Sequence, residues 1–203
     1  FLLAIMNFLA HIYLSGNDEQ IKIGNFIGDY IKGKAFHIYP DKIKEGILLH
    51  RYIDTFTDKN KYTSEAKLLF APKYRKYSGI IIDIIYDHFL AINWEQYSSV
   101  SLIQFIDEFH HLLQKYQEML PSEVQNMVPK LISNNRLYSY RKTEGIQSVF
   151  STMAKYTSLP DHSEFAIKTL QENYTYLKNN FSNFFKDLIY YVENVHNIAI
   201  TGH

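Results

Sequence analysis

The sequence predicts an all-α protein built as a single-domain helical bundle. Apolar residues recur at intervals of three and four, the spacing of an amphipathic helix, most clearly over residues 101–120. No stretch alternates apolar and polar residues as a half-buried strand does. The 203 residues contain no repeat, low-complexity run or interdomain linker, and this length suits one domain with a substantial core.

The first two helices are separated by a cluster of turn residues. Ser15-Gly16-Asn17-Asp18 divides a helix over residues 6–14 from a helix over residues 18–30. The second helix carries Gly24 and Gly28 on one face. Each glycine costs about 1 kcal/mol relative to alanine in a helix, but this spacing lets another backbone approach closely.

Proline and capping residues mark the next three helices. Pro40-Asp41 opens the first of them, Thr63 or Ser64 caps the second, and Pro72 opens the third. Residues 80–82 would also suit a buried strand, but the length of their segment favours a helix. The expected spans are 41–60, 63–70 and 72–93.

Four further helices are expected in the second half. His110 and His111 flank the apolar stripe of the first and are expected at the surface or its boundary. Residues 134–136 break the second of these helices, and the last helix is long enough to bend. The expected spans are 101–120, 121–132, 137–156 and 163–195, which makes residues 6–196 one helical domain and residues 197–203 a tail.

Composition excludes several kinds of site. The apolar fraction of 46% and the charged fraction of 21% are ordinary for a soluble globular protein. The chain has no cysteine, which excludes disulfides, cysteine-ligated zinc, iron–sulfur clusters and thiol nucleophiles. The absence of cysteine is compatible with a reducing cytoplasm, where we expect the protein to act. No apolar run reaches the roughly 18 residues of a membrane span, so no membrane association is expected.

The first residues do not resemble a signal peptide. Residues 1–5 precede Met6, so we expect Met6 to be the native start and residues 1–5 to be a non-native leader. The stretch lacks a basic n-region, and Asn7 and His11 interrupt its apolar run.

Charge is unevenly distributed although the formal net charge is zero. Residues 30–79 contain eleven lysines and arginines but only five acidic residues, a net charge of +6. Such a region would attract an acidic partner or a phosphate, but it would serve equally well as a solvated surface. The basic residues are Lys32, Lys34, Lys42, Lys44, Arg51, Lys59, Lys61, Lys67, Lys73, Arg75 and Lys76.

Two short helical stretches carry histidine and aspartate at one-turn spacing. His50 lies one turn from Asp54, and Asp83 lies one turn from Asp87, with His88 about 100° further round. Two such helices can converge on a divalent metal, because imidazole suits transition metals and carboxylate suits Mg²⁺ and Mn²⁺. A buried polar network without metal is the alternative.

The first half of the chain resembles the acyl carrier protein phosphodiesterase family. The match covers roughly residues 6–94, in the order and near the spacing of the family, and the second half adds mainly the pair Tyr140-Arg141. The matching stretches are residues 6–11, 24–29 with Gly33, 46–47, 50–54, 57–58 and 83–90 with Trp94.

The resemblance implies an enzyme that hydrolyses the phosphodiester between 4′-phosphopantetheine and a serine of holo acyl carrier protein. It also implies a divalent cation, most often Mn²⁺, with Mg²⁺ or Fe²⁺ as the alternatives. The fold implied is HD-domain-like, because the family is distantly similar to helical phosphohydrolases that hold metal with histidine and aspartate. Holo acyl carrier protein would then be the partner, and its acidic helix would suit the basic region.

On this basis we assign expected roles to eight residues. Asp54 and Asp83 are expected to be further ligands or to orient the ligands. His11 is expected to act as general acid or base, and Arg51 to contact phosphate or pair with a neighbouring acid. The expected metal ligands are Asp29, His50, Asp87 and His88.

Two other functions fit the same residues. One is an HD-like hydrolase of a nucleotide or another small phosphoester, and the other is a non-catalytic helical binding protein. No glycine-rich phosphate loop supports a kinase or GTPase, and the basic residues form no recognised nucleic-acid module. The sequence leaves open the oligomeric state, the number of ions and the role of the second half.

Overall fold

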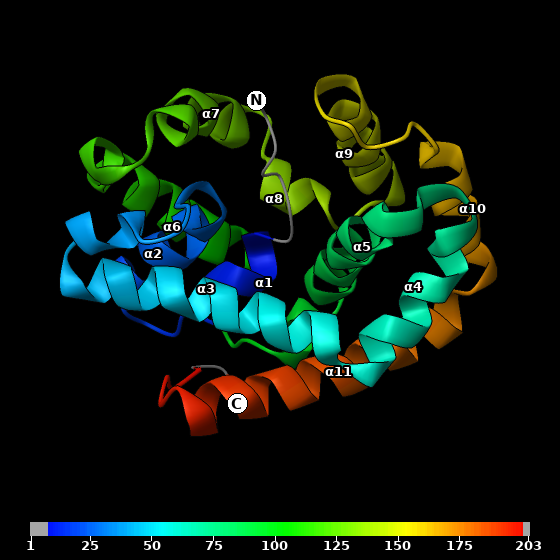
Figure 1. The fold of residues 1–203 in the computed structure, drawn as a ribbon, viewed down its shortest axis with the longest axis horizontal. Helices are drawn as coiled ribbons and strands as arrows, with labels where there is room; N and C mark the ends of the chain where they lie inside the picture. Colours follow the sequence, from blue (N-terminus) through cyan, green and yellow to red (C-terminus); the bar gives the residue numbers. More distant parts are fainter. Residues whose placement is uncertain (1–7, 201–203) are drawn as a thin grey trace.

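The computed structural model describes residues 8–200, which form one helical body without a strand in that range (Figure 1). The all-α prediction is confirmed. Met6, Asn7, the expected leader at residues 1–5 and the tail residues 201–203 lie outside the described residues. The α-helices are α1 (Phe8–Tyr13), α2 (Glu19–Ile27), α3 (Asp41–Lys59), α4 (Lys61–Tyr74), α5 (Ser78–Ile92), α6 (Leu102–Lys115), α7 (Ser122–Ser133), α8 (Arg136–Ser139), α9 (Thr143–Tyr156), α10 (Ser163–Glu172) and α11 (Tyr174–Val195).

Short 3₁₀ turns connect several of these helices. They are η1 (Gly28–Tyr30), η2 (Ala35–Ile38), η3 (Arg75–Tyr77), η4 (Trp94–Gln96) and η5 (Gln117–Met119). Two predicted helices therefore end early. The helix expected to reach residue 30 changes to a 3₁₀ turn at Gly28, and the helix expected to reach residue 120 ends at Lys115.

The N-cap of α4 differs from the prediction. The side chain of Asn60 accepts a hydrogen bond from the backbone N–H of Tyr62 at 2.9 Å, so Asn60 is the cap and not Thr63 or Ser64. Asparagine caps a helix as well as serine or threonine does. Here it also follows directly on the end of α3.

The predicted break at Pro72 is also wrong. Pro72 lies inside the last turn of α4, where its missing N–H removes only one helical hydrogen bond. The chain breaks at Arg75 instead, where the backbone adopts a φ of 49°. The helix expected over residues 72–93 therefore begins at Ser78.

Two long helices expected in the second half are each divided. The segment over residues 137–156 forms α8 and α9, with Asn135 in the left-handed region (φ 44°) just before α8. The segment over residues 163–195 forms α10 and α11. The side chain of Asn173 donates a hydrogen bond to the carbonyl of Thr169 at 2.9 Å, which satisfies one carbonyl at the end of α10.

The two N-terminal helices α2 and α3 cross in backbone-to-backbone contact. A Cβ at Gly24 would overlap the carbonyl of Ile43, and a Cβ at Gly46 would overlap the carbonyl of Ile21. The close approach expected from the glycine spacing is therefore present. Gly46 of α3 lies against the backbone of α2 in the same way as Gly24 of α2 lies against the backbone of α3. This crossing places Asn25 on α2 beside His50 on α3.

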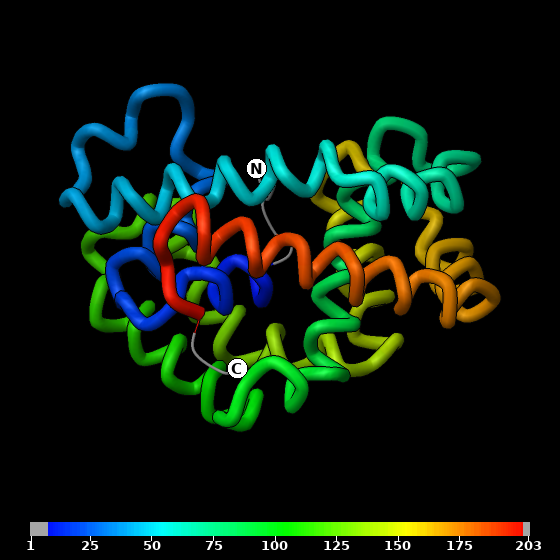
Figure 2. Tube along the Cα trace, turned by 90° about the horizontal axis from the view of Figure 1, so that it is seen from below, coloured from blue at the N-terminus to red at the C-terminus, as the bar shows by residue number. Residues whose placement is uncertain are grey.

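The long C-terminal helix packs on the core. Figure 2 shows α11 lying alongside α3, with α4 and α5 near its first half. Phe181 of α11 packs against Tyr86 and Phe89 of α5, with ring centroids 5.6 and 5.8 Å apart. The core side of α11 also buries Leu177, Phe184, Phe185, Leu188 and Val192.

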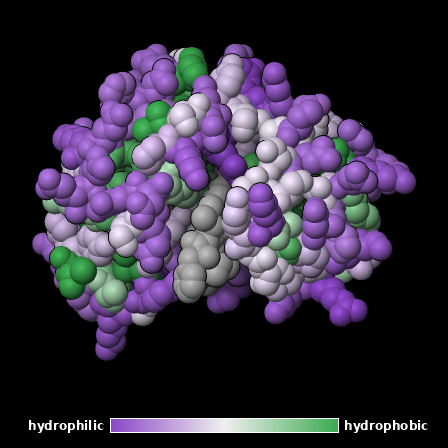
Figure 3. Space-filling model, turned by 90° about the horizontal axis from the view of Figure 1, so that it is seen from above, coloured by the Kyte–Doolittle hydropathy of each residue, from purple (hydrophilic) through white to green (hydrophobic). Residues whose placement is uncertain are grey.

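No helix among residues 8–200 is both long and apolar enough to cross a membrane. On the side shown in Figure 3, hydrophilic side chains cover most of the described surface, and the hydrophobic residues are scattered between them. The apolar residues gather in the interior instead.

We expect Gly46→Ala to destabilise the fold by about 3 kcal/mol or more, because a backbone carbonyl cannot move aside as a side chain can. Gly79→Ala is the matched control: a Cβ there would meet only the end of the Lys67 side chain, at 3.3 Å. Urea unfolding of both variants measures the difference. Equal free energies of unfolding would show that the α2–α3 crossing adapts.

Candidate metal centre

Two histidines and one aspartate from α1 and α3 face one another, with both imidazoles buried and the carboxylate of Asp54 partly exposed. The Nε2 atom of His11 lies 3.3 Å from Oδ1 of Asp54, and the Nε2 atom of His50 lies 3.2 Å from Oδ2 of the same carboxylate. The two imidazole rings are stacked with centroids 4.1 Å apart. One ligand atom from each of the three residues lies within 4.8 Å of the others, so His11, His50 and Asp54 could hold a metal ion.

Asn25 of α2 orients both imidazoles. Its side-chain nitrogen donates to the carbonyl of His11 at 2.8 Å and to Oγ of Ser15 at 2.9 Å, so its Oδ1 is left facing Nδ1 of His11 at 2.7 Å. Its backbone carbonyl accepts a hydrogen bond from Nδ1 of His50 at 2.8 Å. Both Nδ1 atoms must therefore carry hydrogen, which directs the Nε2 lone pairs toward Asp54.

This arrangement fits a cation. The Nε2 atoms of His11 and His50 are buried, and neither makes a hydrogen bond. Two lone pairs that face a carboxylate repel it unless a proton or a metal ion lies between them. Two imidazoles and one carboxylate suit a divalent transition metal, and three protein ligands leave positions open for water or substrate.

Asp29 adds a second carboxylate to this group. It lies in η1, directly after α2, and its Oδ1 is 3.2 Å from Nε2 of His50. Gly28 makes room for the approach, because a Cβ there would overlap the ring of His50. Asp29 and Asp54 therefore flank the same imidazole nitrogen.

The two carboxylates control the charge of His50. Burial by itself lowers the pKa of His50, but the adjacent Asp29 and Asp54 outweigh it and raise this pKa to about 10. Burial likewise raises the pKa of Asp54, but His11 and His50 lower it well below its ordinary range. Without metal, a proton on His50 thus takes the place of the cation.

The fold divides the four residues expected to be metal ligands. Asp29 and His50 meet at the centre, but Asp87 and His88 do not belong to the group of His11, His50 and Asp54. The carboxylate of Asp87 accepts hydrogen bonds from the backbone N–H groups of Leu9 and Ala10 at 3.0 and 2.9 Å, at the start of α1. Burial raises the pKa of Asp87 to about 7, against the effect of these two hydrogen bonds.

His88 lies on a different side of α5. Its Nδ1 is 2.7 Å from the carbonyl of Tyr140, the residue directly after α8. Burial lowers the pKa of His88 and the hydrogen bond opposes this change, so its neutral ring donates to the carbonyl. His88 thus connects α5 to the α8 region, and Asp87 connects α5 to α1.

Arg51 and Asp83 also occupy distinct positions. The guanidinium of Arg51 donates to the carbonyls of Ile31 and Gly33 at 2.8 and 2.9 Å and lies over the ring of Phe36. It therefore holds the connection after η1 in place.

Asp83 faces Asp54 across a surface groove. Burial together with the charge of Asp54 raises the pKa of Asp83 well above the ordinary value.

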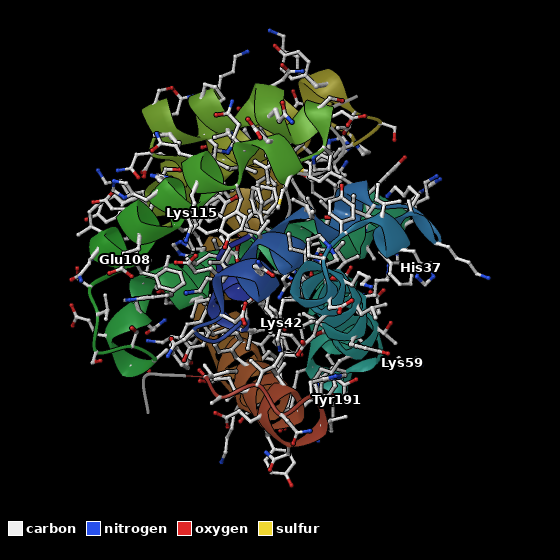
Figure 4. The ribbon with its side chains drawn as sticks, turned by 90° about the vertical axis from the view of Figure 1, so that its left-hand side faces the viewer. His37, Lys42, Lys59, Glu108, Lys115 and Tyr191 are labelled. Carbon is white, nitrogen blue, oxygen red and sulfur yellow. The ribbon has the colours of Figure 1, made fainter. Side chains whose placement is uncertain are left out.

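The remaining histidines of interest lie away from the centre. His37 is exposed in η2 and lies at the edge of the molecule opposite Glu108 and Lys115 in Figure 4. His111 is exposed as expected. His110 is buried, which corrects the expectation for that residue, because it lies on the core side of α6.

Sequence reasoning missed Asn25 and undervalued His11. Asn25 stands four residues before Asp29 in a stretch that carries the family resemblance, but an asparagine between glycine and phenylalanine gives no local sign of its role. His11 was expected to exchange protons, whereas the structure places it in the group that could bind a metal.

A family model described as acyl carrier protein phosphodiesterase matches residues 6–188. The chain belongs to the acyl carrier protein phosphodiesterase family. The match includes the second half of the chain, which the resemblance in the sequence had covered only weakly.

Curated relatives agree along most of the chain. A protein named acyl carrier protein phosphodiesterase from Enterobacter sp. (strain 638) is 30% identical over 190 residues, covering 93% of this chain and 98% of the relative. Relatives of the same name are 32% identical in Yersinia pestis, over 73% and 78% of the two chains, and 31% identical in Salmonella agona (strain SL483), over 89% and 94%. No solved structure matches.

We expect Asn25→Ala to weaken Mn²⁺ binding by about 10- to 100-fold, because the two imidazoles lose the group that orients them. Asn126→Ala, an exposed substitution on α7, is the control and should bind as the wild type does. Isothermal titration calorimetry with Mn²⁺ measures both. Unchanged affinity in Asn25→Ala would mean that packing alone orients the rings.

Metal affinity should rise with pH. The raised pKa of about 10 means that His50 holds a proton at neutral pH, and a metal ion must displace it. Between pH 6 and 8 the affinity for Mn²⁺ should therefore increase by up to about tenfold per pH unit for this proton. Titrations in buffers of different ionisation enthalpy would count the proton released, and a pH-independent affinity would contradict the assignment.

Proposed function

We propose that this protein hydrolyses the phosphodiester between 4′-phosphopantetheine and a serine of holo acyl carrier protein. The products are apo carrier protein and free 4′-phosphopantetheine. The observation that carries the proposal is the pair of buried Nε2 atoms of His11 and His50 that face the carboxylate of Asp54 without hydrogen bonds. The relatives are named acyl carrier protein phosphodiesterases, and this name supplies the substrate.

The protein residues have separate tasks in this proposal. His11, His50, Asp54 and Asp29 would hold a divalent cation, for which Mn²⁺ is our first choice and Mg²⁺ or Fe²⁺ the alternatives. When bound there, such an ion supplies Lewis acidity and a water of lowered pKa. Asn25 holds the imidazoles in the required tautomer.

Asp83 is our candidate for a proton donor. Hydrolysis adds water to phosphorus, breaks the bond from phosphorus to the serine oxygen, and leaves that oxygen in need of a proton. Asp83 faces the groove beside Asp54, and burial keeps its carboxyl group protonated at a higher pH than usual. A protonated carboxyl group next to the reacting phosphate can donate that proton.

The basic region supports an acidic protein partner. Lys42 and Lys59 of α3 are exposed and are seen along with His37 on the side shown in Figure 4. These cations would attract an acidic carrier protein, and the association should weaken as salt rises.

We place the reaction in the cytoplasm, because a chain without cysteine suits a reducing compartment.

The test is incubation of the protein with holo acyl carrier protein and Mn²⁺, followed by intact mass analysis of the carrier protein. The wild type should remove a mass equal to the phosphopantetheine arm. Asp29→Ala and His50→Ala should lower the rate about 100-fold or more, because each removes a group from the metal centre. His111→Ala, an exposed substitution on α6, should leave the rate unchanged.

Other outcomes would favour the other functions. Turnover of a nucleotide or another small phosphoester, with no change in holo carrier protein, would indicate an HD-like small-molecule hydrolase. Failure to bind Mn²⁺, with the same thermal stability before and after chelation, would indicate a non-catalytic helical protein.

A further inference from the structure

A groove lies between α3, α4 and α5, whose ribbons meet on the face seen in Figure 1. Its volume is about 460 Å³, within the range of about 300 to 1,000 Å³ that is typical of small-molecule sites. Leu68, Ala71 and Ile80 give it apolar walls, and charged side chains line the rest.

The groove is continuous with the metal centre. Asp54 belongs to the group that could bind a metal and also lines the groove, opposite Asp83 of α5. Any group bound in the groove near Asp54 therefore lies beside the proposed ion. None of the residues from α4 that line it has a role in the centre itself.

Three cationic side chains enter the groove. The Nζ of Lys67 is bound to Oδ1 of Asp58 at 2.7 Å and passes over Gly79, where a Cβ would lie 3.5 Å from it. Arg75 and Lys76 line the groove from η3, directly after α4, and are exposed. Among residues 8–200 the guanidinium of Arg75 makes no hydrogen bond or ion pair, so it is available to a ligand.

The backbone of Arg75 is strained. Its φ of 49° and ψ of −121° lie in a region that glycine adopts readily and side chains with a Cβ avoid. Strained residues of this kind cluster at active sites and ligand-binding positions. A glycine would serve the turn better, so the arginine at this position points to a function for its guanidinium.

We propose that the groove is an oxyanion subsite in which Arg75 contacts the phosphoryl oxygens of a substrate held at the metal centre. This inference rests on the proposed function. The guanidinium presents paired N–H donors that match two phosphate oxygens. Lys76 adds charge beside it, whereas Lys67 is already occupied by Asp58. Arg75 is thus a substrate-binding residue for phosphoesters.

The first experiment measures inorganic phosphate binding to the Mn²⁺-loaded protein by calorimetry. Arg75→Gly should weaken phosphate binding at least about tenfold, leave Mn²⁺ affinity unchanged, and raise or maintain the melting temperature, because glycine relieves the strained backbone. Lys73→Ala is the matched control: it removes one exposed positive charge from the last turn of α4, two residues before Arg75 and outside the groove. It should change neither phosphate binding nor stability.

Arg75→Lys provides a second variant that keeps a side chain at the position. It retains the charge but loses the planar pair of donors, so phosphate binding should weaken by about threefold or more while the protein stays folded. If Arg75→Gly does not fold, this variant carries the test alone.

Two results would overturn the subsite. The first is phosphate affinity equal to that of the wild type in both Arg75 variants. The second is weaker binding of holo carrier protein with unchanged phosphate affinity, which would assign Arg75 to the protein surface that meets the carrier. Both results come from binding measurements and do not depend on turnover. If the Arg75 variants bind phosphate more weakly but the wild type does not hydrolyse carrier protein, the subsite is supported and only the proposed function is refuted.

Discussion

The contact between the backbones of α2 and α3 is the constraint on which the rest of this structure depends. Gly24 and Gly46 remove the side chains that would keep the two helices apart. The close crossing allows one residue, Asn25, to reach His11 through its side chain and His50 through its carbonyl. Gly28 then lets the ring of His50 lie against the end of α2, next to Asp29. Packing of small residues thus determines the chemistry of the centre.

Burial of the two imidazoles creates a demand for positive charge. Two partly exposed carboxylates converge on two buried ring nitrogens that make no hydrogen bond, and a proton on His50 meets this demand when no metal ion is bound. Asp87 supports the arrangement from a distance, because its hydrogen bonds to Leu9 and Ala10 hold α1 and therefore His11 in place. Asp87 is itself a buried carboxylate, and the two hydrogen bonds that offset the cost of its burial are the same ones that position α1.

Helix α3 connects the two parts of the proposed site. One turn of it presents His50 and Asp54 to the centre, and the carboxylate of Asp54 also borders the groove between α4 and α5. Arg75 and Lys76, from the strained turn after α4, line the same groove. An anionic phosphoester bound there would meet positive charge from the protein on one side and from the proposed ion on the other, as electrostatic stabilisation of phosphoryl transfer requires.

The C-terminal half gives this arrangement a rigid support. Phe181 and its neighbours on α11 pack against α5, and the carbonyl of Tyr140 binds His88. The orientation of α5, and with it the position of Asp83, therefore depends on residues far along the chain. This dependence is consistent with a family match that extends to residue 188.

The sequence by itself determined the helical class, most of the helix ends and the common face of His50 and Asp54, because periodicity, caps and one-turn spacing are local properties. Only the tertiary structure decided which face of each helix meets which neighbour. Rotation of α5 about its axis directs Asp83 to the groove, Asp87 to α1 and His88 to Tyr140, although all three are close in sequence. In the same way, Asn25 contacts both imidazoles only because α2 and α3 cross closely, and the sequence does not encode that crossing locally. Spacing along one helix places residues on a common face, but the packing of the other helices decides what that face contacts.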